Sequence, residues 1–310
     1  MIKSLFDRHD KKVLRVLVCL ITALSVVLSC FSGCSSAGKT TAEEENKSET
    51  ETESVPDSVN IAILKSIETR NPVGGNFTYS FEWTDNSVRI NDSSDNGFYI
   101  DIEFDAGGKI TKAAAVNDNK KIEGNFVYDN GNLIKSEIYN ADVQNEKLKE
   151  MSFTYENGRV SSMIYSDASN ETLALSYKYN EASRIVSFWM GDETKAINLD
   201  WQQNSVAAYD PAGQKYGAAE FADGKCKSVT LYGNSTTADF VYDDSDNLTE
   251  LKINREQNEN DPTVSLNWNP GGSKAQATVS QTFIRAMMTL SFCFYEADPE
   301  ATVLSYLINI

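Results

Sequence analysis

Large apolar side chains alternate with polar ones along many short segments of the chain. The clearest examples are Phe77–Trp83, Phe98–Phe104, Leu173–Tyr179 and Ile197–Trp201, in each of which every second residue is large and apolar. Successive side chains of a β-strand point to opposite faces, so this period predicts strands with one apolar and one polar face. Antiparallel sheets that bury one face and expose the other have this pattern. Between these strands the chain has no long segment of helical period.

Each of these strands belongs to a repeat of about two strands. A strand ends in an aromatic residue, which we call the strand-end aromatic, and a polar turn follows. The nine strand-end aromatics are Trp83, Phe104, Tyr128, Tyr155, Tyr179, Trp201, Phe221, Tyr242 and Trp268. They lie 20 to 27 residues apart, a length that fits two strands and two turns. Asn130-Gly131 and Asn157-Gly158 supply the positive-φ pairs that type I′ hairpin turns require. The repeat therefore predicts β-hairpins.

An antiparallel meander of about nine hairpins cannot stay flat with one apolar face exposed. It must curl into a wide or flattened barrel-like sheet or fold into two layers. A fully round barrel of that size would leave a hollow, so a flattened or plugged barrel is expected. Near the C-terminus, Met288–Phe294 alternates like one more strand, and Asp298-Pro299 begins a short C-terminal helix. Its apolar end, residues 307–310, is expected to dock on the sheet or to plug one mouth.

The first 33 residues have the pattern of an export signal. Five basic residues precede the uncharged apolar run Val16–Leu28, which as a helix would be about 20 Å long and too short for a ~30 Å hydrocarbon layer. The following Phe31-Ser32-Gly33-Cys34 resembles the bacterial lipobox. That resemblance implies cleavage before Cys34 and a lipid attached to its thiol. Cys30 is a rival acceptor, and ordinary secretion is the alternative.

The chain divides into three parts by composition. Residues 1–33 form the lipoprotein signal peptide, 34–58 an acidic linker, and 59–310 a single repeat-built β domain. Residues 35–58 contain seven acidic side chains and no aromatic one, so they bury too little apolar surface to fold. As a flexible coil they would span roughly 27 Å and hold the β domain away from the membrane.

Composition excludes several kinds of chemistry. Removal of the signal peptide leaves 23 basic and 43 acidic residues, a net charge of −20, which repels phosphate backbones and argues against nucleic acid as a partner. The single histidine of the chain, His9, leaves with the signal peptide. Catalysis by Ser-His-Asp or Cys-His groups and zinc held by histidine are therefore excluded. We predict no metal, no cofactor and no catalytic residue.

A few residues remain as candidates for specific roles. Cys226 and Cys293 are too few for a metal cage, and two separately buried thiols are favoured over a disulfide. The acidic turn Asp243–Asp246 could suggest calcium, but it lacks the twelve-residue loop of such sites and is explained as a turn. Trp189 lies between Phe188 and Met190. Three large apolar residues in succession predict either an exposed, ligand-binding Trp189 or a strand covered on both faces.

The clearest copies of the repeat suggest a family. Residues 126–133, 153–160 and 240–248 read FVYDNGNL, FTYENGRV and FVYDDSDNL and resemble the YD repeats of secreted bacterial proteins. With the lipoprotein signal, the single β-meander is similar to the uncharacterised gut-bacterial lipoproteins with a porin-like fold. The resemblance covers about residues 77–277. It implies a curled β-shell on the cell envelope, with no established activity and no catalytic residue to carry over.

We expect an exported, lipid-anchored lipoprotein of the cell envelope or cell surface with a non-catalytic binding role. Its expected partners are the membrane, through lipidated Cys34, and a glycan polymer or an envelope protein. One alternative is a glycan hydrolase that uses two of the many carboxylates. The other is a purely structural envelope component.

Overall fold

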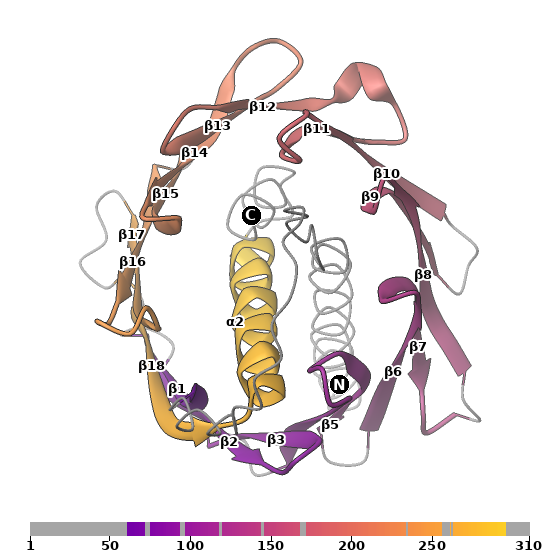
Figure 1. Cartoon of the computed structure of the whole chain (residues 1–310), viewed down its shortest axis with the longest axis vertical. Coiled ribbons are helices and arrows are strands. Elements are labelled where there is room, and N and C mark those ends of the chain that lie inside the picture. Colours follow the sequence, from indigo (N-terminus) through magenta and orange to yellow (C-terminus); the bar gives the residue numbers. More distant parts are fainter. Residues whose placement is uncertain are drawn as a thin grey trace, which may run out of the picture.

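The computed structural model describes residues 61–71, 75–93, 97–117, 120–143, 146–167, 172–233, 235–255, 261 and 263–295. The predicted signal peptide, the linker and Cys34 lie outside the described residues. The described chain forms an antiparallel β-barrel with one α-helix inside it (Figure 1).

The barrel has 18 strands. In chain order they are β1 Ile61–Asn71, β2 Gly75–Trp83, β3 Ser87–Asp92, β4 Phe98–Phe104, β5 Ile110–Asn117, β6 Lys120–Asp129, β7 Asn132–Asn140, β8 Glu146–Glu156, β9 Arg159–Asp167, β10 Thr172–Tyr179, β11 Ile185–Met190, β12 Ile197–Trp201, β13 Ser205–Tyr209, β14 Lys215–Ala222, β15 Lys225–Leu231, β16 Thr236–Tyr242, β17 Leu248–Arg255 and β18 Thr263–Gly272. A 3-10 helix, η2 (Glu193–Lys195), lies between β11 and β12, and α2 (Lys274–Tyr295) follows β18.

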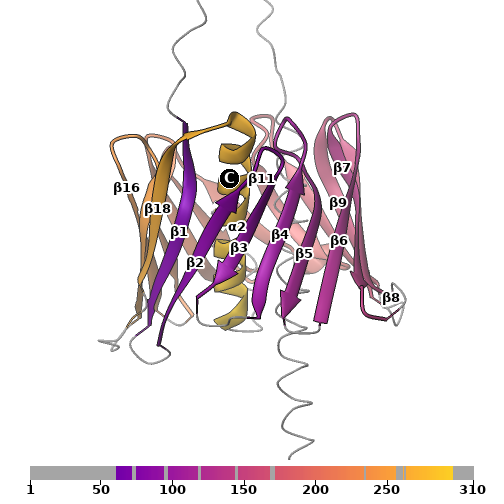
Figure 2. The ribbon, with the colours of Figure 1, turned by 90° about the horizontal axis from the view of Figure 1, so that it is seen from below.

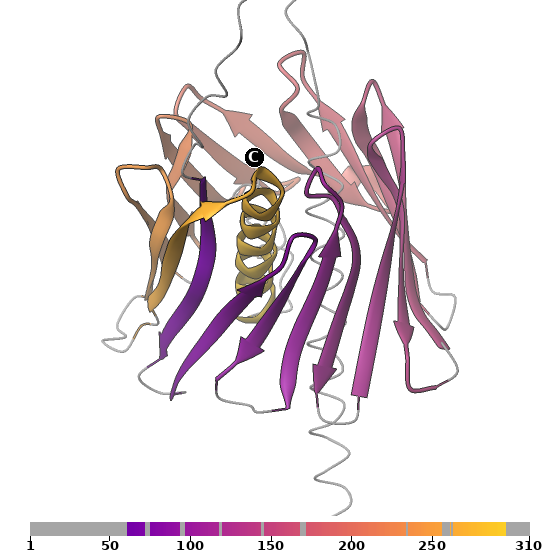
Figure 3. The same ribbon diagram turned by 60° about the horizontal axis from the view of Figure 1, so that its bottom comes forward.

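Each strand pairs antiparallel with its neighbours in the chain, and β1 pairs with both β2 and β18 to close the barrel. The closure completes the ninth repeat, because Leu64 of β1 pairs with the last strand-end aromatic, Trp268. The first strand thus supplies the return strand that the last repeat lacks. The predicted meander of about nine hairpins curled into a barrel is confirmed, and the strands enclose a lumen, as Figures 2 and 3 show from two sides.

The two faces of the barrel differ sharply in polarity. Directly paired residues share a face, and the row through Phe81, Ile90 and Ile100 is buried and apolar. Phe81 meets Phe283 of α2 with ring centroids 5.3 Å apart, so this face is the inner one. The neighbouring row through Arg89 and Asp101 is charged and points outward. The alternation in the sequence is therefore apolar toward the lumen and polar toward the outside.

The strand-end aromatics form a ring just inside one rim of the barrel. Each strand-end aromatic pairs with a residue of the next strand around the barrel, which we call the post-turn residue. Six of the strand-end aromatics donate a side-chain hydrogen bond to the backbone carbonyl of the post-turn residue of the preceding repeat. These bonds are Trp83 to Leu64 (2.7 Å), Tyr128 to Ile110 (2.9 Å), Tyr155 to Leu133 (2.8 Å), Tyr179 to Val160 (2.8 Å), Trp201 to Ile185 (2.7 Å) and Trp268 to Leu248 (2.9 Å). The bond of Trp83 crosses the closure, since Leu64 belongs to β1. Six of the nine repeats are thereby linked by a hydrogen bond to the repeat before them.

Removing the hydroxyl of one strand-end tyrosine tests how much the ring of strand-end aromatics contributes to stability. Tyr155→Phe deletes the bond to the carbonyl of the fully buried Leu133. We expect this change to lower the free energy of unfolding by about 1–2 kcal/mol, because the carbonyl loses its partner. The control is Tyr242→Phe, since Tyr242 makes no hydrogen bond to a described residue. Equal denaturation midpoints for both variants would contradict the role of the ring.

Helix α2 runs inside the barrel against β1 (Figure 1). It begins at a capping box: the Gln276 backbone N–H donates to Ser273 Oγ (3.2 Å), and the Ser273 backbone N–H donates to Gln276 Oε1 (2.8 Å). Ala275, Val279 and Phe283 repeat at four-residue spacing and are buried. The residue types at Ser273 and Gln276 carry this capping signal in the sequence itself.

The predicted strand at Met288–Phe294 is wrong, because these residues belong to α2. Helix formation is cooperative, so a helix that is capped at Ser273 and buried along one side extends through a short alternating segment. Among the described strands, the closed barrel also leaves no unpaired edge for another strand to join. The short C-terminal helix predicted from Asp298 lies outside the described residues. Within the described part of the chain, no helix is both long enough and apolar enough to span a membrane.

Candidate functional site

Trp189 of β11 lies on the outer face of the barrel. It pairs with Ser176, whereas its neighbour Phe188 is buried on the inner face. The Trp189 side chain is half-buried, and Lys178 Nζ lies 5.4 Å from the centre of its ring. Met190 returns to the inner face and is 46% exposed. The three large residues therefore alternate in direction, and the strand is not covered on both faces.

Lys178 connects the Trp189 ring to the charged segment of η2. Lys178 also forms an ion pair with Glu193 of η2. Asp192 caps η2 by accepting hydrogen bonds from the backbone N–H (3.0 Å) and the hydroxyl (2.8 Å) of Thr194, and these bonds lower the pKa of the Asp192 carboxyl. An aromatic ring with an adjacent cation and adjacent acceptors can stack on a sugar or receive a polar protein surface. The structure thus places a half-buried Trp189 beside Lys178 on the outer face.

The rest of the outer face carries ladders of opposite charges across neighbouring strands. Arg89 makes two hydrogen bonds to the Asp101 carboxylate, 2.7 Å and 2.8 Å long. Hydrogen bonds from Lys121 and Lys112 hold the pKa of Glu123 below its usual value, against the opposing effect of partial burial. These carboxylates are ionised acceptors that secure pairs across the sheet.

Four described carboxyl groups have a lowered pKa. Every described acidic side chain with a perturbed pKa is shifted downward, namely Glu123, Glu150, Asp192 and Asp243. A glycosidase of the two-carboxylate type needs one carboxyl group whose pKa is raised. None of these four carboxyl groups has the raised pKa of such an acid.

The acidic turn after β16 is held by its own backbone. Asp243 Oδ1 accepts hydrogen bonds from the backbone N–H groups of Ser245 (2.9 Å) and Asn247 (2.8 Å). Although burial opposes it, the hydrogen bonds from Asn247 and Ser245 lower the pKa of Asp243. Asp246 forms an ion pair with Lys225 of the neighbouring hairpin. Among the described residues no group of three or more His, Cys, Asp or Glu side chains is arranged to hold a metal.

Cys226 is buried and not in a disulfide. Burial raises the pKa of its thiol to about 12, so at neutral pH the group is a neutral thiol and not a nucleophile. The side chain of Cys293 lies outside the described residues.

The structure shows a recurring pair that the sequence analysis did not find. In four repeats, a basic residue directly before the post-turn residue lies over the next strand-end aromatic. The pairs and their distances to the ring centre are Lys109 and Tyr128 (5.8 Å), Arg159 and Tyr179 (5.6 Å), Arg184 and Trp201 (4.8 Å), and Lys225 and Tyr242 (5.6 Å). The signal in the sequence is a Lys or Arg that recurs at this position of the turn.

Comparisons with known proteins give structural likeness only. No protein-family model matches the chain, and no curated protein matches it. Among solved structures it is similar to a porin-like protein from Bacteroides uniformis, with 10% identity and a TM-score of 0.39, covering 66% of this chain and 96% of that one. It is also similar to a porin-like protein from Bacteroides vulgatus, with 10% identity and a TM-score of 0.31, covering 66% of this chain and 98% of that one.

Proposed function

We propose that the protein is a lipid-anchored lipoprotein of the cell envelope whose barrel has a non-catalytic binding role. The observation that carries the proposal is the polarity of the barrel, with its apolar face toward α2 and its ion-paired face outward. The outer face of this barrel is charged and carries the half-buried Trp189. The ligand class that this surface suits is a glycan polymer or a polar protein partner.

The charged outer face supports a barrel that lies outside the bilayer. Placing Lys or Arg on the lipid face of a membrane β-barrel costs about 2–4 kcal/mol per residue at the midplane. Arg89, Lys135 and Lys147 all lie on the outward face in ion pairs. A barrel with this surface needs a separate attachment to reach a membrane, and the lipidated Cys34 would provide it through the acidic linker.

The attachment is tested by Cys34→Ala. We expect this variant either to appear in the soluble fraction or to accumulate as uncleaved precursor, because the acyl chains depend on the Cys34 thiol. The measurement is membrane fractionation with mass determination of the product, with Cys30→Ala as the matched control that keeps the lipid. A cleaved Cys34→Ala protein that stays with the membranes would refute lipid attachment at this residue.

The binding role is tested at Trp189. We expect Trp189→Ala to weaken retention on a bound glycan by roughly tenfold, since stacking on an aromatic ring contributes on the order of 1–2 kcal/mol. Retention and product release are measured together on cell-wall, host and dietary glycans. Tyr232→Ala is the control, because Tyr232 is also exposed and lies 4.8 Å from a lysine, Lys215. Product release that a single Asp or Glu substitution abolishes would favour the hydrolase.

A further inference from the structure

Three hydroxyl side chains lie in a line with Trp189 on the outer face of the barrel. Thr154 of β8 pairs with Ser162 of β9, and Ser162 pairs with Ser176 of β10. Ser176 in turn pairs with Trp189 of β11. Directly paired residues share one face of a sheet, so we call these four residues the hydroxyl row. It crosses four strands, and at about 4.8 Å between neighbouring strands it is roughly 14 Å long.

The hydroxyl groups of the row are available to a ligand. Thr154 is exposed, and Ser162 and Ser176 are half-buried. Within the described part of the chain, none of these three hydroxyl groups makes a hydrogen bond, whereas the Ser161 hydroxyl donates to the Thr154 backbone carbonyl (3.2 Å). Each hydroxyl can donate one hydrogen bond and accept others. The row therefore presents hydrogen-bonding groups at the spacing of the strands.

Apolar surface borders the hydroxyl row on one side. Ile164 of β9 is 44% exposed and pairs with the exposed Ala174 of β10. Each lies two residues from a serine of the row on the same strand, so both share its outward face. Together with the Trp189 ring, they place apolar contacts directly beside the hydroxyl groups. A sugar ring, with C–H groups on its faces and hydroxyl groups on its edge, matches this combination.

The charges near the hydroxyl row do not favour an acidic sugar. Lys178, 5.4 Å from the centre of the Trp189 ring, is balanced by its ion pair with Glu193. At the other end of the row, Glu156 is exposed two residues after Thr154 on β8. The chain without residues 1–33 has a net charge of −20, which repels polyanions. A neutral glycan is therefore a better match than an acidic one.

The width of the surface favours a glycan chain over a protein. A stable protein interface buries roughly 800 Å² on each partner around an apolar centre. Here the large apolar side chains are the half-buried Trp189 and Ile164, and ion pairs such as that of Lys147 and Glu150 begin on β8. A single glycan chain is narrow and needs only a strip of this kind.

We propose that the hydroxyl row binds a neutral glycan whose chain crosses strands β8–β11. One sugar ring stacks on Trp189, and the following sugars form hydrogen bonds with Ser176, Ser162 and Thr154 in turn. Each sugar unit advances the chain by about one strand spacing, so consecutive sugars meet consecutive hydroxyl groups. The inference rests on the proposed binding role of Trp189 and adds the class and the direction of its ligand.

The test of the ligand class is electrophoresis of the purified protein through gels that contain xyloglucan, galactomannan, dextran or polygalacturonate. We expect at least one of the three neutral polymers to retard the protein and the acidic polygalacturonate not to. Oligosaccharides of the retarding polymer should bind more tightly with length up to about three or four sugars, because the row is roughly 14 Å long. Retardation by polygalacturonate alone, or by none of the four polymers, would overturn the proposal.

Serine variants locate the glycan on the row. Ser176→Val and Ser162→Val should each weaken binding about three- to tenfold, the effect of one lost hydrogen bond, because valine suits a strand but has no hydroxyl group. The matched control is Ser228→Val on the outer face of β15, where Ser228 pairs with Glu220 and Asp239. It should leave binding unchanged, and the denaturation midpoints of all three variants show that the barrel is intact.

The outcomes separate this inference from the proposed function. Retention that Trp189→Ala weakens but neither row variant changes would overturn the hydroxyl row and keep Trp189 as a binding residue. Retention that none of these substitutions changes would place the glycan elsewhere and refute both. A purified protein partner whose binding Trp189→Ala weakens, with no retention on any glycan, would also overturn the row as a glycan site.

Discussion

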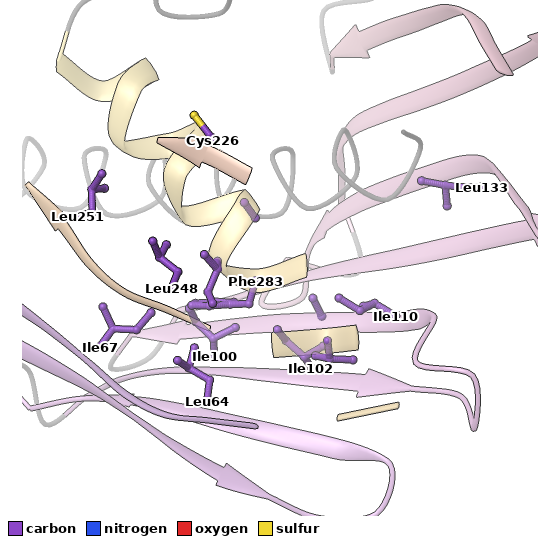
Figure 4. Packing of buried hydrophobic residues seen from close by; sticks show 14 of the residues in the cluster. Leu64, Ile67, Ile100, Ile102, Ile110, Leu133, Cys226, Leu248, Leu251 and Phe283 are labelled. Atoms are coloured by element: carbon purple, nitrogen blue, oxygen red, sulfur yellow. The ribbon is translucent and has the colours of Figure 1, made fainter. Parts of the chain in front are cut away.

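Phe283→Ala is expected to lower the free energy of unfolding by about 3–5 kcal/mol, the usual cost of removing a phenylalanine from a packed core. Phe283 is 1% exposed and meets the Phe81 ring edge-on at a centroid distance of 5.3 Å. Figure 4 shows it among the apolar side chains of the inner face. Its removal leaves a cavity between α2 and the wall of β2, which the closed barrel cannot collapse to fill. Denaturant unfolding followed by tryptophan fluorescence measures the effect.

The matched control for this change is Val241→Ala. Val241 is apolar but 40% exposed on the outer face, so its truncation should change stability by no more than about 0.5 kcal/mol. If Phe283→Ala and Val241→Ala cost the same, α2 does not pack inside the barrel in solution.

Gly108→Ala is expected to cost about 2–4 kcal/mol, although it adds a single methyl group. Gly108 has φ +82°, a conformation that costs an L-residue about 1–2 kcal/mol. A Cβ atom there would also lie 2.8 Å from the Ala275 carbonyl oxygen and 2.8 Å from Thr278 Cβ. Both contacts belong to the first turns of α2, so the helix or the turn must shift, and overpacking of this kind adds about 1–3 kcal/mol.

Gly158→Ala separates the two causes. Gly158 has φ +75° in the equivalent turn of another hairpin, but a Cβ atom added there would meet no heavy atom within 4 Å. Only the backbone cost of about 1 kcal/mol is expected there. The midpoint of thermal or denaturant unfolding should therefore be lower for Gly108→Ala than for Gly158→Ala, because only the Cβ atom added at position 108 contacts α2. Equal midpoints would show that the turn at Gly108 does not support the helix.

The repeat was the part of the fold that could be predicted, for reasons that are local in the sequence. Alternation such as Phe77–Trp83 specifies a strand and its two faces within a few residues. The Asn-Gly turns adopt the predicted positive φ, 48° and 87° at Asn130 and Gly131 and 53° and 75° at Asn157 and Gly158. Nine strand-end aromatics at regular spacing then implied nine hairpins.

The helix could not be predicted because two local signals conflict at the end of the chain. Met288–Phe294 alternates with a period of two, whereas the capping box at Ser273–Gln276 and the spacing of Val279 and Phe283 favour a helix. The barrel decides between them, since it closes through β1 and β18 and its described strands leave no edge for the segment to join.

The surroundings of Trp189 could be predicted only in part, and its binding role stays a prediction. Trp189 was singled out from its two large neighbours, but its outward direction follows from its pairing with Ser176. A cavity between α2 and the β14–β15 and β16–β17 hairpins was not predicted, because no pattern along the chain brings its lining side chains together.

The sequence by itself determined the hairpins, their number and the polarity of each strand, because side-chain alternation and turn conformation depend on neighbouring residues only. The tertiary structure alone decided the closure, the inward direction of the apolar face and the place of α2. Ser280 of α2 accepts a hydrogen bond from the backbone N–H of Leu64, 216 residues earlier in the chain (3.1 Å). Such long-range contacts form because burial of the whole inner face compensates for the entropy lost on loop closure. No short segment of the sequence encodes that balance.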